Sequence, residues 1–323
     1  MVADGGGGDD EESQTSRPES RAPAPRSTEP HVMEAPVVAG RDPEADAALD
    51  RIVLEGTPRL LRSWPVTLVT GVVAGLEVGL GVLALLYVKE QTGSQALAGL
   101  AFSIGFIALL LGRSELFTEG FLTPIAVVAA KRARLLDAVK LWIGILAGNL
   151  AGGMLLAWFA MRGFPELHVE ARRAGAYFAL HGWSLRGISL AILAGMAVTL
   201  MTRMHNGTES MPVKLVASVA IAFLLAGLRL YHSVLDSLLI FFALQSGHAP
   251  YGYLDWARFF GESVVGNVVG GVALTTVLRL LQSRRRLIEH RIHAEIEAKE
   301  IQQGERATLS APPLEQPPDH GGV

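Results

Sequence analysis

The stretch "GRSELFTEG", residues 112–120, places two acids, a base and a hydroxyl between two long apolar runs. Arg113, Glu115, Thr118 and Glu119 interrupt a segment that otherwise has the composition of a lipid-embedded helix. Irregular polar backbone is tolerated at membrane depth only where it lines a cavity or is buried in protein. This stretch, called the first break below, therefore predicts a membrane domain with an internal polar site.

The composition agrees with a membrane protein that carries soluble ends. Of the 323 residues, half are hydrophobic and 18% are charged, and the charges gather toward the two ends of the chain. Such a distribution indicates a polytopic membrane protein. The net charge of -3 gives no sign of nucleic-acid binding, and the absence of cysteine excludes disulfides and thiolate chemistry. No cofactor-binding or metal-binding motif is found.

Apolar segments long enough to cross a bilayer, which takes about 20 residues, recur along the middle of the chain. We predict six of them, at residues 64–88, 97–130, 135–161, 186–204, 212–245 and 257–281. The second and the fifth are too long for one simple span. The fifth is interrupted at "GLRLYHSVLDS", residues 227–237, which we call the second break. The prediction is an all-α protein of six spans with two of them broken.

The domain organisation follows from the same composition. Low apolar content predicts disordered tails over residues 1–45 and 304–323. Between them we expect a six-span pore domain, 46–281, which starts with a short interfacial helix, and a basic cytoplasmic helix, 282–303. Lys and Arg are more numerous on the side of the two termini, which places both termini in the cytoplasm.

The two halves of the membrane domain repeat one another. "AGNLAGG" (147–153) lies in the third span and "VGNVVGG" (265–271) in the sixth, and each follows a broken span. Three spans repeated must invert, because three is odd, and inverted repeats with paired broken helices are typical of transporters. Small residues also let helices pack closely in lipid. That explains the glycines but not the buried Asn149 and Asn267.

These motifs together resemble the formate/nitrite transporter family. The resemblance rests on "SELFTEG", "GNLAGG", "GLRLYHS" and "GNVVGG" in that order, and it covers about residues 60–280. It implies an aquaporin-like fold, a homopentamer in the inner membrane, and one pore per protomer. The implied cargo is a small monovalent anion or its weak acid, such as formate or nitrite.

The resemblance also implies roles for single residues. Leu116 and Phe117 would form an apolar constriction, and Thr118 would offer its hydroxyl toward the pore centre. His232 would be the central histidine that exchanges protons with the cargo. Asn149 and Asn267 would hold the broken elements or line the pore.

Three departures from the family put the substrate in question. No lysine occurs between Lys140 and Lys214, where the family keeps one near the fourth span, so His181 and Arg186 are candidates for that vestibule. Arg113 and Glu119 are added charges in the first break, and Arg229 is one in the second. The third departure is that His232 is spaced differently from its preceding glycine, Gly227. We expect these arginines to pair with nearby acids, because unpaired charge in a membrane is costly. The acids available are Glu115, Glu119 and Asp236.

Other functions remain open at this point. His232 and Asp236 lie four residues apart and could share a helix face in an intramembrane hydrolase, although no third ligand or nucleophile is evident. A membrane scaffold would leave the paired breaks unexplained. A channel for water or a neutral solute would need no titratable group at its centre.

Overall fold

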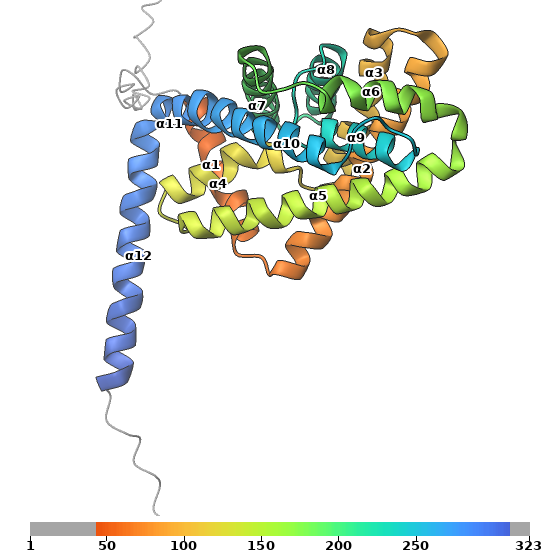
Figure 1. The fold of residues 1–323 in the computed structure, drawn as a ribbon. Helices are drawn as coiled ribbons and strands as arrows, with labels where there is room; N and C mark the ends of the chain where they lie inside the picture. Colours follow the sequence, from red (N-terminus) through yellow and green to blue (C-terminus); the bar gives the residue numbers. More distant parts are fainter. Residues whose placement is uncertain (1–42, 311–323) are drawn as a thin grey trace, which may run out of the picture. The chain divides into compact units, whose positions relative to one another are not determined.

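The computed structural model describes residues 43–310, with side chains to residue 303, and every regular element in that range is helical. This confirms the predicted all-α class. Most of the predicted tails, 1–42 and 311–323, lies outside the described residues. Figure 1 shows the helices in order. Their bounds are α1 Pro43–Leu60, α2 Trp64–Thr92, α3 Gln95–Gly112, η1 Phe117–Phe121, α4 Leu122–Ala129, α5 Leu135–Gly163, η2 Pro165–Leu167, α6 His168–Ala179, α7 Leu185–Asn206, α8 Met211–Gly227, α9 Leu235–Gln245, α10 Tyr253–Val268, η3 Val269–Thr276, α11 Val277–Gln282 and α12 Arg284–Ser310.

Five helical stretches among the described residues are long and apolar enough to cross a membrane. They are α2, α3, α5, α7 and the continuous run of α10, η3 and α11. The fifth predicted segment is instead two shorter helices, α8 and α9, so a count of six spans stays a prediction. In each of the five stretches, less than half of the most apolar window is buried within the chain. The remaining apolar surface is available to lipid or to neighbouring subunits.

Both breaks occur where the sequence predicts them. Helix α3 ends at Gly112, and four non-helical residues lead to η1 and α4. Helix α8 ends at Gly227, and the chain resumes a helix at Leu235. Each break contains an arginine in the left-handed region, Arg113 with φ 54° and Arg229 with φ 53°. That conformation costs an L-residue about 1–2 kcal/mol, so the same irregularity in both halves marks a shared architecture.

Glycines let the spans of each half approach to backbone contact. A Cβ on Gly75 of α2 would lie 2.2 Å from the carbonyl oxygen of Asn149, and a Cβ on Gly195 of α7 would lie 2.1 Å from that of Asn267. Only glycine fits such crossings. The repeat predicted from the two glycine motifs is therefore present as two equivalent helix crossings, α2 with α5 and α7 with α10.

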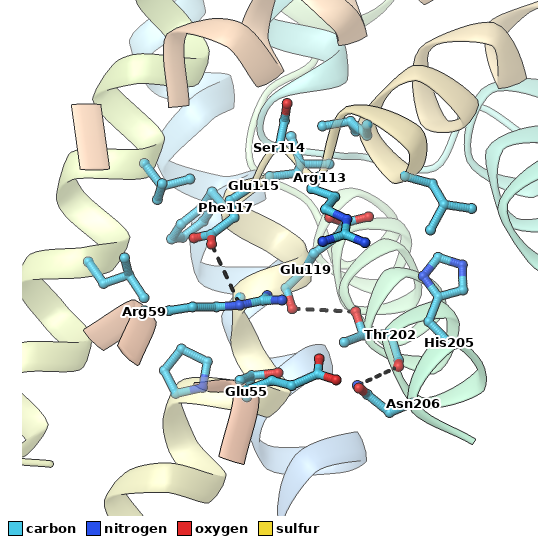
Figure 2. Close-up of a pocket in the computed structure, with 18 of the residues that line it drawn as sticks. Glu55, Arg59, Arg113, Ser114, Glu115, Phe117, Glu119, Thr202, His205 and Asn206 are labelled. Carbon is cyan, nitrogen blue, oxygen red and sulfur yellow. Dashed lines mark hydrogen bonds and ion pairs between the residues drawn. The ribbon is translucent and has the colours of Figure 1, made fainter. Parts of the chain in front are cut away.

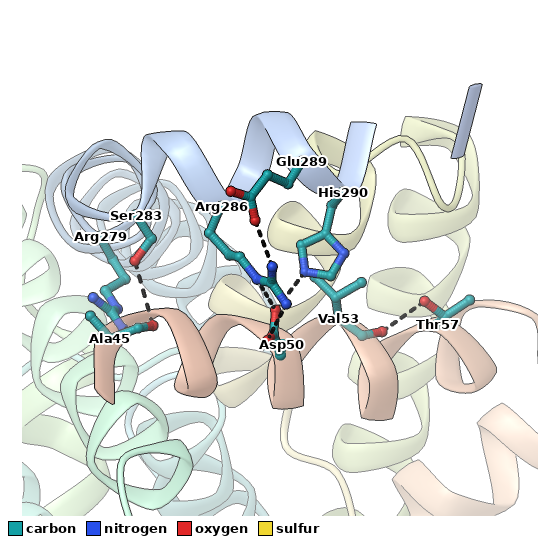
Figure 3. Close-up of polar contacts among 9 residues, drawn as sticks. All are labelled: Ala45, Asp50, Val53, Thr57, Arg279, Ser283, Arg286, Glu289 and His290. Atoms are coloured by element: carbon teal, nitrogen blue, oxygen red, sulfur yellow. Dashed lines mark hydrogen bonds and ion pairs between the residues drawn. The ribbon is translucent and has the colours of Figure 1, made fainter. Parts of the chain in front are cut away.

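Helix α1 is fastened to α12. The Arg286 guanidinium bonds both carboxylate oxygens of Asp50, at 2.7 and 2.8 Å, and His290 Nε2 lies 2.8 Å from the same carboxylate. Arg286 also contacts Glu289, and Arg279 donates to the carbonyl of Ala45 (Figure 3). Helix α1 overlaps the short helix predicted at the start of the pore domain, and α12 overlaps the predicted basic helix, 282–303. The interfacial place of the first and the cytoplasmic place of the second stay predictions.

Candidate functional site: the junction of the two breaks

Asn149 holds the first break against two spans. From α5, its Oδ1 accepts the backbone N–H of Phe117 at 2.9 Å. Its Nδ2 donates to the carbonyls of Glu115 and of Gly71 on α2, each at 3.0 Å. The carboxamide is fully buried. Two of its bonds satisfy backbone groups of the break, which have no helical partners, and the third joins the break to α2.

Asn267 does the same for the second break. Its Oδ1 accepts the N–H of Ser233 at 2.9 Å, and its Nδ2 donates to the carbonyls of Tyr231 and of Ala191 on α7, each at 2.8 Å. In both halves the amide binds one N–H and the carbonyl two residues earlier. The two asparagines are therefore equivalent clamps, and neither amide has an N–H left to donate to an anion in this arrangement.

Thr118 and His232 join the two breaks. Thr118 Oγ1 lies 2.7 Å from His232 Nε2, and both side chains are fully buried. The other ring nitrogen, Nδ1, accepts the backbone N–H groups of Val234 at 3.2 Å and Leu235 at 3.0 Å. A nitrogen that accepts two N–H groups carries no proton of its own. The neutral ring thus keeps its proton on Nε2 and donates it to Thr118.

Asp236 serves the backbone rather than the histidine ring. Its Oδ2 accepts the backbone N–H of His232 at 2.7 Å. A hydrolytic pair would need the carboxylate on an imidazole nitrogen. Asp236 is instead a local cap for the turn that leads into α9.

Leu116 and Phe117 directly precede Thr118 in the chain, and their role as an apolar constriction, called the barrier below, stays a prediction. Both are buried, and the Phe117 ring packs edge to face with Phe121, their centroids 5.1 Å apart. Phe121 in turn packs against Trp142 of α5 at 5.9 Å. Leu116 and Phe117 also line a cavity on the α1 side of the molecule, so they lie between that cavity and Thr118.

The cavity has a volume of about 600 Å³ and is lined by charged side chains from four parts of the chain (Figure 2). Glu115 lies there at 2.7 Å from Arg62 and 3.8 Å from Arg59. We expected Arg113 to pair with one of Glu115, Glu119 and Asp236, and this is wrong, because the end of α1 supplies two arginines to Glu115. Within the described part of the chain, Arg113 makes no ion pair.

The second break contrasts with this. Arg229 donates to Gln95 Oε1 at 2.8 Å and lies 4.6 Å from the centre of the Tyr177 ring. The expected pair with Asp236 is not formed. Arg229 and Asp236 line a cavity of only about 20 Å³, on the α6 side, which is room for about one water.

The vestibule candidates lie on the same α6 side. His181 and Arg186 are both exposed, and the His181 ring is 6.1 Å from that of Tyr231. Their predicted role in attracting anions stays a prediction. Three further residues that line the large cavity were not predicted from the sequence: Arg59, His205 and Lys214. They lie at helix ends, where basic residues are expected for orientation alone, so nothing marked them.

A model of the formate/nitrite transporter family matches residues 46–281. The chain belongs to this family. Membership confirms the resemblance and makes the chain a multi-pass transport protein, not an enzyme. This removes the hydrolase and the scaffold from the alternatives.

Relatives of this formate/nitrite transporter family member are distant but cover most of it. It is 25% identical to the inner membrane protein YfdC of Escherichia coli K12, over 81% of this chain and 85% of that protein. It is 26% identical to the formate channel BtFdhC of Bacillus thuringiensis, over 72% of this chain and 92% of that protein. A solved pentameric formate channel with formate bound superposes with a TM-score of 0.57 at 20% identity, over 68% and 96% of the two chains, and shows the shared fold.

Proposed function

We propose that the chain conducts small monovalent anions of weak acids, such as formate or nitrite, through a pore in each protomer, with proton exchange at His232. The observation that supports it most is the 2.7 Å contact between Thr118 and His232, made where the two breaks meet. Relatives described as formate channels support the substrate class.

The apolar barrier favours passage of the neutral acid. An anion between Leu116 and Phe117 would lose its water and find no polar partner, which costs many kcal/mol, whereas a neutral acid avoids most of that cost. Beyond the barrier, the Thr118 hydroxyl accepts from His232 and is free to donate to the cargo. A threonine held in this way selects for an acceptor oxygen.

The bonds at Nδ1 limit what His232 can do. Because both backbone N–H groups point at Nδ1, the ring exchanges protons only through Nε2, toward Thr118. His232 can release the proton on Nε2 only if Nε2 receives another proton, because Nδ1 is occupied by two backbone N–H groups. The scheme therefore needs a second proton-carrying group.

The protein would lie in the inner membrane, as the name of one relative states for that relative. Both termini would be cytoplasmic, which puts the large cavity on the cytoplasmic side. A homopentamer would cover part of the exposed apolar surface, as in the pentameric channel of the same fold. Five pores would then work side by side.

Uptake by proteoliposomes tests the function. We expect formate or nitrite to enter faster as the outside pH falls, while glycerol and water permeability stay at the level of empty vesicles. His232→Asn should flatten this pH dependence, and Thr118→Ser should keep it where Thr118→Val does not. Transport of water or glycerol without any anion would favour the neutral-solute channel and refute the proposal.

A further inference from the structure

Arg113 is a strained cation facing an open cavity. Its backbone is left-handed at φ 54°, and the side chain is exposed at the end of α3. Strained positions persist where the surroundings need them and cluster at functional sites. In Figure 2 its guanidinium extends into the space bordered by Glu115, Glu119 and His205.

The nearby acid does not neutralise Arg113. Glu115, two residues on, already contacts Arg62 at 2.7 Å and Arg59 at 3.8 Å. Among the described residues, no carboxylate accepts a hydrogen bond from the guanidinium N–H groups of Arg113. An arginine fork fits two oxygens of one planar anion better than a point charge does.

Glu119 lines the same cavity. In the sequence it follows the barrier residues, whereas Arg113 precedes them. Glu119 is half-buried and lines the cavity together with Leu116 and Phe117. No ion pair of Glu119 occurs in the described residues. In the sequence it is one residue from Thr118 and two from Phe117.

The cavity contains other charged and titratable groups around this pair. They are Glu55 and Arg59 of α1, Glu115 of the first break, His205 of α7 and Lys214 of α8, with Glu77 of α2 nearby. Glu115 is engaged by arginines, and His205 is bonded to the Lys214 carbonyl at 3.2 Å and to Ser218 at 3.1 Å. Glu119 is the acid next to Thr118 in the sequence.

We propose that Arg113 and Glu119 form a binding site for a planar, two-oxygen anion at the inner end of the large cavity, and that Glu119 gives this anion its proton there. The inference rests on the proposed function and supplies the proton source that His232 alone lacks. Arg113 would hold both oxygens through its N–H groups. One O–H bond of Glu119 breaks and one forms on the anion, so a neutral acid and a Glu119 carboxylate result.

Water in the cavity then returns a proton to Glu119. The neutral acid leaves Arg113, because its attraction to the guanidinium ends with its charge, and passes Leu116 and Phe117. The second break has no counterpart of this pair. Arg229 is held by Gln95 and Tyr177, and Leu235 follows where an acid would be needed. Proton delivery is therefore one-sided.

Binding is measured on the detergent-purified full chain, by calorimetric titration with sodium formate. We expect one site per chain. Arg113→Gln should raise the Kd at least about tenfold, as for the loss of a hydrogen bond to a charged group, and Arg113→Lys should raise it less. Glu55→Gln, in the same cavity, and Arg229→Gln should bind as the unaltered chain does. Equal affinity in Arg113→Gln would overturn the assignment of Arg113, and so would the absence of any binding to the unaltered chain.

Transport separates this inference from the proposed function. In proteoliposomes, Glu119→Gln should cut formate uptake at least about tenfold, as for a lost general acid, and should remove the response to pH on the α1 side while keeping the response on the α6 side. Glu55→Gln should change neither. If the unaltered chain transports formate and Glu119→Gln keeps both responses, the site is refuted and the transport proposal survives. If the unaltered chain binds formate but transports no anion, the transport proposal fails and proton delivery by Glu119 fails with it.

Discussion

The two breaks share one scaffold but have opposite surroundings. Each is clamped by an asparagine through three backbone bonds, and each contains a left-handed arginine. The first break borders a cavity of about 600 Å³, whereas residues 230–243 of the second break and α9 are continuously buried. The repeat therefore fixes the backbone where the two breaks meet, and the elements outside the repeat decide what each break contacts.

Removing the two asparagine clamps, Asn149 and Asn267, should lower the stability of the protein by different amounts. All three bonds of Asn267 are buried, whereas the bond from Asn149 to Glu115 is partly open to the cavity. Each buried backbone group left without a partner costs about 1–3 kcal/mol. We expect Asn267→Ala to lower the free energy of unfolding by at least about 3 kcal/mol. Asn149→Ala should lower it by about 1 kcal/mol less, because water can reach the carbonyl of Glu115.

Thermal unfolding in detergent, followed by the monodisperse fraction on size exclusion, measures both. Asn149→Asp and Asn267→Asp serve as size-matched controls that keep the acceptor and lose the donor. Equal losses in the two alanine variants would mean that the cavity gives the first break no access to water.

The helix crossings should respond alike in the two halves. A methyl group on Gly75 or Gly195 would clash with a backbone carbonyl that cannot move freely. Overpacking of this kind costs about 1–3 kcal/mol. Gly75→Ala and Gly195→Ala should therefore lower the midpoint of thermal unfolding by similar amounts. Gly163→Ala, where no atom lies within 4 Å of the added Cβ, should leave it nearly unchanged. A strong effect of only one crossing would break the equivalence of the halves.

Much of this scaffold can be predicted from the sequence. Hydropathy and the spacing of "GNLAGG" and "GNVVGG" depend on neighbouring residues, so the positions of the breaks and of the glycine crossings follow from local patterns. The charge pairing could not be predicted in the same way. Arg59 and Arg62 reach Glu115 from more than 50 residues away, and no local pattern shows where α1 ends. Helix α6 was also missed, because its 12 residues are too few and too polar on average to be read as a membrane span.

The pairing of Glu115 with α1 belongs to the first break alone. A double-mutant cycle of Glu115→Gln and Arg62→Gln should give a coupling energy of about 1 kcal/mol, since the Arg62 side chain is 31% exposed and solvent screens the pair. The coupling should shrink as salt is added. Thermal unfolding of the four proteins at two salt concentrations gives the value. A coupling of zero would mean that α1 stays on the first break by apolar packing only.

Breaking the contact between α1 and α12 should have the smallest effect on stability. We expect it to loosen the first break, which α1 contacts, and not the second. Hydrogen bonds from Arg286 hold the pKa of the Asp50 carboxyl below its ordinary value, and desolvation opposes this. A lowered pKa in the folded protein means that Asp50 stabilises the contact above its unfolded pKa, about 3.9, and that this stabilisation is lost as the pH falls through the lower folded value. Near neutral pH the contribution is therefore complete and constant.

Asp50→Asn should weaken the docking of α1 by less than about 1 kcal/mol, because both side chains are about one-third exposed. Hydrogen exchange should then rise in α1 and in the first break, while the second break stays protected. Glu44→Gln, an exposed acid on the same helix, is the matched control. If exchange rose equally in both breaks, α1 would be stabilising the whole membrane domain. A rise confined to α1 and the first break would instead show that the chain ends regulate access to one side of the pore, which the inverted repeat by itself cannot do.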